Sequence, residues 1–548
     1  MAAGKQAAPF RFKRHDEVGA AGAEEDAEFL SACFVDTGDL KLLESPHDKR
    51  VIVLGRTGSG KTALLLELQE QRDNVIALVP ENLALSYLSN STILKFFDSL
   101  GVNLDPFFKL LWRHVLTVEI LNRYFSDHPS KQEETLINRL RNLFPGKSVK
   151  EKGAQEAIDY LTQWGEKFWQ ETEYRVREIT EKVENDLEAA AQAGINLTIG
   201  ELSATGTASH RLTQEQKSDL VARGQHIVSE AQVQDLSKVL GLLRTVLEDR
   251  QQVYYVTVDK LDENWVEERI RYKLIMALIL TAKEFLQVKN AKIVLALRRD
   301  LIERVFRLTR DSGFQEEKYH SLYLPLEWQK SDLIDLLDRR IARLVRRTYT
   351  QAPVTHRDLL PLRIDKIKID EYLYQRCQRP RDIISFFNTC IHAAEGKPKV
   401  HVQALRKAEG EWSRQRFRAL GDEWSADYPR LLDFAMLLRG RPRSFKVKSI
   451  ASEEIEGFCL DRAAEAPEGH GILQRIVLQV VDLLLEPEEA RKQIIRIFYR
   501  VGLVGLKLAP HESESWVDQL GRGVSSAEID EETSVVIHTA FHRELGVK

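Results

Sequence analysis

Short apolar runs alternate along this chain with longer stretches in which apolar residues recur at helical spacing. Runs rich in Val, Ile and Leu occur at residues 51–54, 74–80, 253–259, 291–297 and 322–325. Such runs are typical of strands buried inside a sheet, and strands that alternate with helices favour a parallel sheet. The pattern therefore predicts an α/β fold, with a parallel-sheet domain over residues 49–330.

Helical spacing dominates most of the remaining chain. Residues 1–48 are predicted to form an N-terminal lead-in, whose helical part at 27–48 packs against the α/β domain. An apolar helical stretch at 91–125 is expected to belong to the core. A helical insertion is expected at about 100–250, between the second and third strands, and it is highly charged from residue 126 onward. Its charged faces are either solvated or part of a partner-sensing surface. Residues 331–422 are predicted to form a small helical lid.

The last part of the chain, residues 423–548, combines helices with two predicted strands at 504–508 and 534–538. Helices followed by a two-stranded wing resemble a winged-helix domain, which serves either in DNA binding or in protein contacts. A basic run at 439–448 either grips a phosphate backbone or forms a solvated loop. No aromatic ladder accompanies this run, which favours the loop.

The composition narrows the classes of function. The 548 residues carry a formal net charge of -4 at pH 7, so a uniformly basic nucleic-acid binder is not expected, although local basic patches remain possible. The four cysteines form no C-x-x-C pair, which argues against a disulfide framework or a zinc site and fits a reducing cytosol. No apolar run approaches the roughly 18 residues that span a membrane. We therefore expect a cytoplasmic protein without membrane contacts.

A glycine-rich motif follows the first predicted strand. It reads Gly55-Arg56-Thr57-Gly58-Ser59-Gly60-Lys61-Thr62 and fits G-x-x-x-x-G-K-[ST] at every fixed position. The glycines allow backbone N–H groups to curl around a phosphate, and the N-terminus of the following helix adds partial positive charge. We expect Lys61 to reach the β- and γ-phosphates of ATP, and the Thr62 hydroxyl to bind Mg²⁺.

An acidic cluster follows the third predicted strand. Asp259 lies at the end of this strand, where open α/β sheets bind ligands. We expect Asp259 to hold Mg²⁺ through water beside Thr62. Asp262 or Glu263, one turn further on, is expected to orient or deprotonate the attacking water. Acids at such positions are also common helix caps, but the upstream glycine loop favours the metal-binding interpretation.

Two arginines follow the fourth predicted strand. Arg298 or Arg299 is expected to point at the γ-phosphate and to report whether it is present. The alternative is a surface arginine that pairs with Asp300.

Together these motifs resemble the ASCE branch of P-loop NTPases, nearest to the STAND and AAA+ ATPases. The chain is also similar to a bacterial family of P-loop ATPases through residues 33–38, 258–265, 379–382, 500–507 and 537–545. The resemblance implies a P-loop domain with a helical lid, with ATP and Mg²⁺ as ligands. It also implies a setting in bacterial defence or mobile elements, with a separately encoded effector as partner.

The resemblance also draws attention to the Arg-Pro-Arg-Asp sequence in the lid. An arginine at a helix start in the lid of AAA+-type ATPases commonly contacts nucleotide phosphate, which makes Arg379 and Arg381 candidates. The alternative is an ordinary helix start in which Asp382 balances the two arginines.

One position departs from the pattern of the ASCE enzymes. Many of them place a catalytic Glu directly after the aspartate that binds the metal, whereas this chain has Lys260 there. A slow, switch-like ATPase is therefore expected, in which Asp262 or Glu263 takes the place of that Glu.

Three functions compete at this point. The first is an ATPase switch that controls or assembles a partner protein, such as an antiviral effector, with a homo-oligomer as a further candidate assembly. The second is a DNA-binding ATPase that uses the winged-helix-like domain and the basic helix at 328–347. The third function, a nucleotide kinase, has less support. A kinase would need an acceptor pocket and an arginine-rich lid soon after the glycine loop, and the sequence shows neither.

Overall fold

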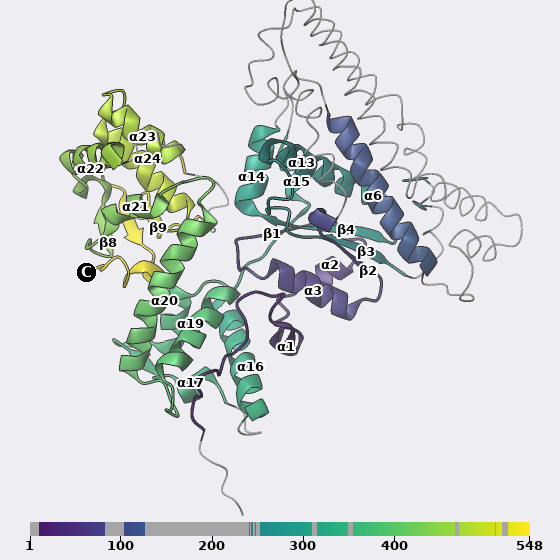
Figure 1. The fold of residues 1–548 in the computed structure, drawn as a ribbon, viewed down its shortest axis with the longest axis horizontal. Helices are drawn as coiled ribbons and strands as arrows, with labels where there is room; N and C mark the ends of the chain where they lie inside the picture. Colours follow the sequence, from purple (N-terminus) through teal and green to yellow (C-terminus); the bar gives the residue numbers. More distant parts are fainter. Residues whose placement is uncertain are drawn as a thin grey trace, which may run out of the picture. The chain divides into compact units, whose positions relative to one another are not determined.

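The computed structural model describes residues 10–82, 104–126, 240–241, 243–244, 247, 252–309, 315–348, 354–465, 471–509, 511–517 and 524–548. The chain forms two compact units (Figure 1). The α/β unit comprises Asp36–Glu327, and the helical unit comprises Met1–Val35 together with Trp328–Lys548. None of the described helices has the length and apolar character needed to cross a membrane.

The α/β unit is built on a five-stranded sheet in which all neighbouring strands are parallel. In the order β2-β3-β4-β1-β5, the strands are β2 (Val75–Leu78), β3 (Tyr254–Val258), β4 (Ala291–Arg298), β1 (Ile52–Gly55) and β5 (Tyr323–Pro325). The side chains of β1, β3 and β4 are almost entirely buried, as parallel strands covered on both faces require. The predicted α/β class and all five predicted strands are confirmed.

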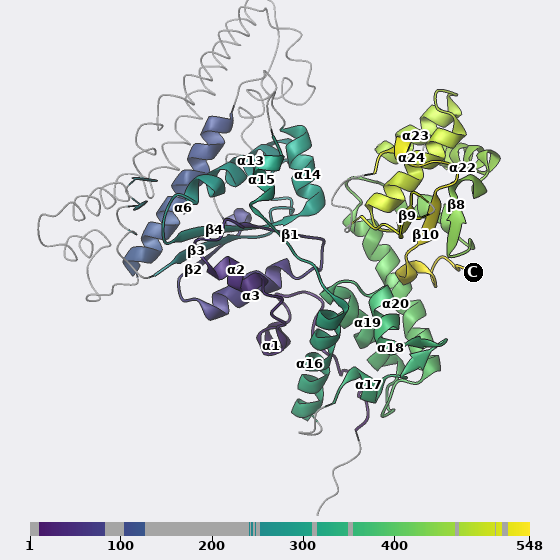
Figure 2. The same cartoon turned by 180° about the vertical axis from the view of Figure 1, so that it is seen from behind.

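Helices cover both faces of this sheet (Figures 1 and 2). On one face lie α2 (Asp39–Glu44) and α3 (Lys61–Gln71), and on the other lie α6 (Asp105–Ser126), α13 (Glu268–Phe285), α14 (Arg299–Leu308) and α15 (Glu317–His320). The indole Nε1 of Trp112 on α6 donates a 2.9 Å hydrogen bond to the carbonyl of Leu274 on α13. Helix α6 therefore belongs to the core of the unit, as predicted for the described part of the apolar stretch that ends at residue 125. The insertion expected from about residue 100 therefore begins only after α6. Residues 127–239 of the predicted insertion lie outside the described part of the chain.

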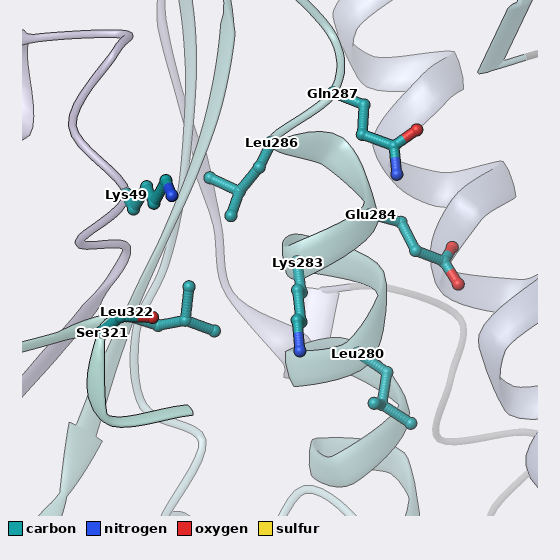
Figure 3. A pocket seen from close by; sticks show the side chains of 8 residues that line it. All are labelled: Lys49, Leu280, Lys283, Glu284, Leu286, Gln287, Ser321 and Leu322. Atoms are coloured by element: carbon teal, nitrogen blue, oxygen red, sulfur yellow. The ribbon is translucent and has the colours of Figure 1, made fainter. Parts of the chain in front are cut away.

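A cavity of about 430 Å³ opens at the edge of the sheet where the strands begin (Figure 3). Its lining includes Lys49, just before β1, Leu322, just before β5, and Leu286, in the turn between α13 and β4. The glycine-rich loop follows the end of β1. This cavity is therefore at the opposite edge from the predicted nucleotide site.

The N-terminal segment differs from the predicted lead-in, because residues 10–35 belong to the helical unit. Phe12, Val18 and Phe29 are buried in the core of that unit. The Phe12 N–H donates to the Lys397 carbonyl at 3.0 Å, and α1 (Ala27–Leu30) and the short 3-10 helix η1 (Ser31–Cys33) follow. Only α2 packs as predicted, against α3 of the α/β unit.

The helical unit contains nine described α-helices after the α/β unit. They are α16 (Lys330–Thr348), α17 (His356–Leu359), α18 (Ile369–Arg376), α19 (Pro380–Ala393), α20 (Val402–Glu423), α21 (Leu431–Ala435), α22 (Ser452–Glu465), α23 (Ile472–Val481) and α24 (Pro487–Arg500). A two-stranded hairpin, β6 (Arg363–Ile364) and β7 (Ile367–Lys368), precedes α18. Helix α18 begins directly after β7.

A small antiparallel sheet lies near the C-terminus. Strands β9 (Val504–Lys507) and β10 (Ser534–Ile537) pair as predicted, and β8 (Ser444–Lys446) adds a third strand on the other side of β10. Strand β8 falls inside the basic run at 439–448, which is therefore not simply a loop. Its side chains form internal contacts, since Arg441 donates to the Leu437 carbonyl at 2.7 Å and Lys448 pairs with Glu532.

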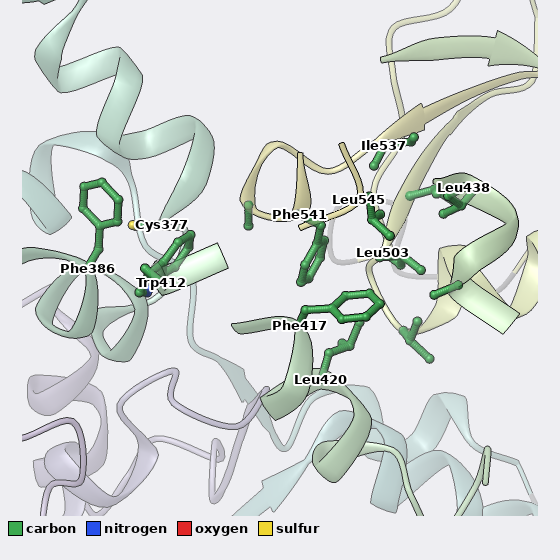
Figure 4. Close-up of a cluster of buried hydrophobic side chains, with 14 of the residues drawn as sticks. Cys377, Phe386, Trp412, Phe417, Leu420, Leu438, Leu503, Ile537, Phe541 and Leu545 are labelled. Carbon is green, nitrogen blue, oxygen red and sulfur yellow. The ribbon is translucent and has the colours of Figure 1, made fainter. Parts of the chain in front are cut away.

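One hydrophobic core joins the predicted lid to the C-terminal part of the chain (Figure 4). The rings of Phe386 and Trp412 meet edge to face, with centroids 5.3 Å apart. The ring of Phe417 on α20 packs against Phe541, near the C-terminus, at 6.1 Å. The predicted boundary between residues 422 and 423 falls at the end of α20, but the core continues across it.

Candidate functional site

The glycine-rich loop connects β1 to α3 in a tight turn. Gly58 and Gly60 have φ angles of 77° and 98°, which are left-handed conformations that glycine adopts without strain. The Ser59 N–H donates to the Arg56 carbonyl at 3.1 Å. A Cβ atom at Gly55 would lie only 2.1 Å from the Ser59 Oγ atom. The loop therefore needs glycine at all three positions for a physical reason.

Lys61 begins α3 and folds back over this loop. Its Nζ atom donates to the carbonyls of Gly55 and Arg56, at 3.2 and 3.1 Å. Burial lowers the pKa of the Lys61 ammonium, and the nearby carboxylates of Asp262 and Asp259 oppose that shift. The ammonium thus lies between the loop and the acidic cluster.

Thr62 and Asp259 meet at the edge of the sheet where the strands end. The Thr62 hydroxyl donates a 2.7 Å hydrogen bond to Oδ2 of Asp259, across 197 positions of the sequence. The other carboxylate oxygen, Oδ1, accepts the N–H of Lys260 at 2.8 Å. Lys260 has a φ of 60°, a left-handed conformation that is uncommon outside glycine and often found at functional sites. The carboxylate is therefore held in one orientation from two sides.

The sheet topology brings these two residues together. Strands β1 and β3 both lie next to β4 and run parallel to it, so all three end at the same edge. The connection after β1 runs to β2 at one edge of the sheet, whereas the chain after β4 crosses to β5 at the other edge. In open α/β sheets, ligands bind at the strand ends near such a change of direction.

The structure distinguishes between the two arginines that follow β4. Arg298 lies in register with Gly55 of the loop. Its guanidinium donates to both carboxylate oxygens of Asp300, at 3.1 and 2.9 Å, and lies 3.7 Å from the carboxylate of Asp262. Arg299 is the first residue of α14 and is half-buried. Arg298 is thus the one that joins the acidic cluster, and it also makes the predicted alternative pair with Asp300.

The segment that carries Asp262 and Glu263 is fixed by a buried arginine. Arg271 on α13 is only 7% exposed, and its Nη1 atom donates to the Glu263 carbonyl and to the Asn264 side chain, both at 2.8 Å. The sequence analysis missed Arg271. The sequence does contain a sign of this role. Arg271 is a charged residue between the apolar Ile270 and Tyr272, and all three are buried in α13.

Arg379 lies in the helical unit and is held by acids there. Arg379 donates to both oxygens of Asp382, at 2.8 and 2.9 Å. It also lies 3.7 Å from Glu423, and Arg416, which the sequence analysis missed, lies 3.3 Å from Asp382. Burial alone would raise the pKa of Asp382, but Arg379 and Arg416 hold it below the ordinary value. Contact of Arg379 with a nucleotide stays a prediction.

Arg381 takes a different position from Arg379. It is exposed, and its Nε atom donates to the Ala21 carbonyl at 3.3 Å. Within the helical unit it therefore fastens the N-terminal segment to α19, and a contact with nucleotide stays a prediction for this residue too.

The residues around the loop have the chemistry of a site for a phosphorylated ligand with a divalent cation. Backbone N–H groups at the start of α3 and the Lys61 ammonium suit phosphate oxygens. The adjacent hydroxyl and carboxylate of Thr62 and Asp259 are oxygen ligands of the kind that Mg²⁺ prefers, in combination with phosphate oxygens and water. The donor set therefore fits Mg²⁺ bound to a nucleoside triphosphate.

Comparisons with known proteins give one family match and one partial relative. Residues 331–421 match the FunZ-associated C-terminal helical domain, and this segment coincides with the predicted lid. The chain is 34% identical over 132 residues to an 80.3 kDa protein assigned to the gamma-delta transposon of Escherichia coli K12. That match covers 21% of this chain and 17% of the relative, so it spans less than a fifth of the relative's length. No solved structure matches the chain.

Proposed function

We propose that this protein is a P-loop ATPase of the ASCE class, which binds ATP with Mg²⁺ and hydrolyses it slowly as a molecular switch. The observation that carries the proposal is the 2.7 Å hydrogen bond between Thr62 and Asp259. In a site of this kind the same hydroxyl and carboxylate bind the metal ion, directly or through water. A glycine-rich turn without function has no need of an acid placed against its threonine.

Each residue of the cluster has a role in this proposal. The loop amides and Lys61 bind the β- and γ-phosphates, while Thr62 and Asp259 orient the metal. Bound Mg²⁺ supplies charge neutralisation for the phosphoryl group that is transferred. The Lys61 ammonium, which now donates to two loop carbonyls, exchanges those acceptors for phosphate oxygens when nucleotide binds.

Asp262 is the preferred base for the attacking water. Its carboxylate lies 3.7 Å from the Arg298 guanidinium and is the largest of the charges that raise the pKa of Lys61. Glu263 is bound through its carbonyl to Arg271 instead. Because Lys260 occupies the position directly after Asp259, the base acts from one turn away, and turnover is slow.

Arg298 is the preferred sensor of the γ-phosphate. Asp300 holds its guanidinium with two hydrogen bonds, on the strand next to the glycine loop. A phosphate group can compete with the Asp300 carboxylate for this guanidinium, because each of the two groups can accept two parallel hydrogen bonds from an arginine. Release of phosphate then returns Arg298 to Asp300.

The switch controls or assembles a separately encoded protein, such as an effector of antiviral defence. Two findings are compatible with this setting. The helical segment matches a FunZ-associated domain, and a partial relative is assigned to a transposon. The partner's identity follows from neither and requires a pulldown of the native protein with mass spectrometry.

A DNA-binding ATPase remains the second candidate, because the C-terminal part resembles a winged helix. Its sheet order β8-β10-β9 and the helices before β9 fit that arrangement. However, α24, the helix before β9, carries Glu488 and Glu489 in its first turn, which repel phosphate, and Arg441 is bound to Glu454. Salt-dependent DNA binding that is lost in Arg441→Ala and Arg443→Ala would favour this second candidate.

Phosphate release from ATP by the full chain tests the proposed function. We expect slow release that requires Mg²⁺ and that is lost in Lys61→Ala. Lys49→Ala is the matched control, since Lys49 is an exposed lysine before β1 at the opposite edge of the sheet. Equal activity in both variants would refute the proposal.

A further inference from the structure

Helix α23 ends in a turn that normally requires glycine. The Leu484 N–H donates to the Gln479 carbonyl at 2.8 Å, and the Leu483 N–H donates to the Val480 carbonyl at 3.1 Å. These two bonds define a Schellman motif, in which the residue after the cap adopts the left-handed conformation and is usually glycine. In this chain that residue is Leu483, with a φ of 58°.

This turn is unfavourable for the isolated unit in two respects. The left-handed conformation costs a residue with a Cβ atom backbone energy that glycine would avoid. The leucine gains no burial in return, since Leu483 is 91% exposed and the next residue, Leu484, is 76% exposed. Strain and apolar exposure at one turn indicate a binding role rather than a folding role.

The charged residues of the segment 482–489 are all acidic, and the first basic residues, Arg491 and Lys492, follow on α24. Asp482 precedes the two leucines, and Glu486, Glu488 and Glu489 follow within the next turn; the first three are exposed and Glu489 is half-exposed. Such a surface repels nucleic-acid phosphates. It fits instead a protein surface that offers an apolar floor within a basic rim.

The same compact unit presents a groove with that chemistry. A cavity of about 670 Å³ is lined by Arg339, Arg343 and Arg346 on α16, together with Ala342, Ala32 and Glu28. The arginines recur at helical spacing and therefore share one face of α16. A cavity of about 150 Å³ can hold benzene, so this groove has room for two leucine side chains.

The charge of the groove is only partly balanced. Arg339 pairs with Asp335 at 2.8 Å and donates to the Phe34 carbonyl at 2.6 Å, and the exposed Glu28 adds one acid to the lining. Arg343 and Arg346 are exposed. Their guanidinium groups are available to carboxylates, while their aliphatic stems can cover apolar side chains.

We propose that the Leu483–Leu484 turn of one chain docks into the Arg339–Arg343–Arg346 groove of a second copy. The leucines contact Ala32, Ala342 and the arginine stems, and the acids beside the leucines pair with the guanidinium groups. Because the turn and the groove are different surfaces, the contact is heterologous and joins copies head to tail, into a ring or a filament. This assembly goes beyond the ATPase switch and does not depend on it.

Two double variants test the contact, with molar mass measured by sedimentation velocity over a range of concentrations. The turn variant carries Leu483→Asp and Leu484→Asp, and the groove variant carries Arg343→Glu and Arg346→Glu. We expect concentration-dependent oligomers of the unmodified chain and monomers of each variant alone. An equimolar mixture should form dimers and nothing larger, because it holds one intact turn and one intact groove.

Folding and alternative contacts are controlled separately. Leu483→Gly preserves the turn and should weaken assembly without lowering the melting temperature, so a folding defect cannot imitate the result. Lys61→Ala should assemble like the unmodified chain. Three results would each overturn the proposal: an unmodified chain that is monomeric, a mixture that stays monomeric, or a groove variant that still assembles. The last of these would show that the turn binds a different surface.

Discussion

The hydroxyl of Thr62 donates a 2.7 Å hydrogen bond to the carboxylate of Asp259, although 197 positions of sequence separate the two residues. The parallel strands β1, β4 and β3 bring them together, because all three end at the same edge of the sheet. This contact connects the glycine-rich loop to the acidic cluster. It is the geometric basis for the metal site that we propose at the start of α3.

Replacing Asp259 should separate turnover from nucleotide binding. We expect Asp259→Ala to reduce Mg²⁺-dependent phosphate release by at least about 100-fold, as loss of a group that positions transition-state charge typically does. Affinity for ATP should change much less, because Lys61 and the loop amides bind the phosphates. Single-turnover kinetics and a fluorescent-nucleotide titration measure the two effects. Normal turnover in Asp259→Ala would show that the metal ligand lies elsewhere.

The two acids after Asp259 should differ in importance. If Asp262 is the base, Asp262→Asn should slow hydrolysis by about 10²–10⁴-fold, and Glu263→Gln should stay close to the unmodified chain. Both substitutions keep the shape of the side chain, so they are a matched pair. The opposite ranking in steady-state phosphate release would assign the base to Glu263.

His356 should make the stability of the helical unit depend on pH. Its ring lies between Asp338 and Asp370, at 2.8 and 2.9 Å. Burial alone would lower the pKa of His356, but the two aspartates outweigh burial and raise it above 6.5. The protonated ring therefore stabilises the fold fully below about pH 6.5, and this contribution is lost as the pH rises through the raised pKa.

Urea denaturation at a series of pH values measures this effect. We expect His356→Gln to remove about 1.5–3 kcal/mol of unfolding free energy at the acidic end, the usual value of a charged hydrogen bond. The difference from the unmodified chain should shrink above neutral pH. A difference that stays constant across this range would show that folding does not shift the pKa of His356, and a difference that grows as the pH rises would show that folding lowers it.

Asp370 has the opposite dependence on pH. The hydrogen bond from Arg357 lowers its pKa to about 2, burial opposes this shift, and His356 adds to it. Its contribution is present above pH 3.8, the ordinary pKa, and is lost as the pH falls toward 2.

Leu483→Gly should stabilise the isolated helical fold. The left-handed conformation costs leucine about 1–2 kcal/mol, and glycine loses about 0.4–1 kcal/mol through greater freedom in the unfolded chain. The net expectation is a gain of about 0.5–1 kcal/mol in the free energy of unfolding. Denaturation at low protein concentration, where copies do not associate, measures this change. A loss of stability would mean that the Leu483 side chain contributes to the fold.

The parallel sheet and the glycine loop could be predicted because their signals are local. The strands are continuous apolar runs, and eight consecutive residues define the loop. The position of Asp259 next to Thr62 could be predicted, because Asp259 follows directly on the buried strand β3. The position of Arg298 beside the loop and the acidic cluster depends on the register of β4 against β1, which no local pattern contains.

Other features depend on distant contacts and could not be predicted. Strand β8 has only three residues and exists through its pairing with β10, far along the chain. The buried residues Phe12 and Phe29 indicate a packed segment, but their pattern does not say which unit they pack against. The left-handed turn at Leu483 lacks the glycine that would have signalled it.

Calorimetric titration of the full chain with ATP, with and without Mg²⁺, tests the central claim most directly. We expect saturable binding that tightens with Mg²⁺ and that weakens by about 10–100-fold or more in Lys61→Ala, since a charged hydrogen bond is worth about 1.5–3 kcal/mol. Lys49→Ala should bind like the unmodified chain. No binding by the unmodified chain, or equal binding by Lys61→Ala, would contradict a nucleotide site at the Thr62–Asp259 contact.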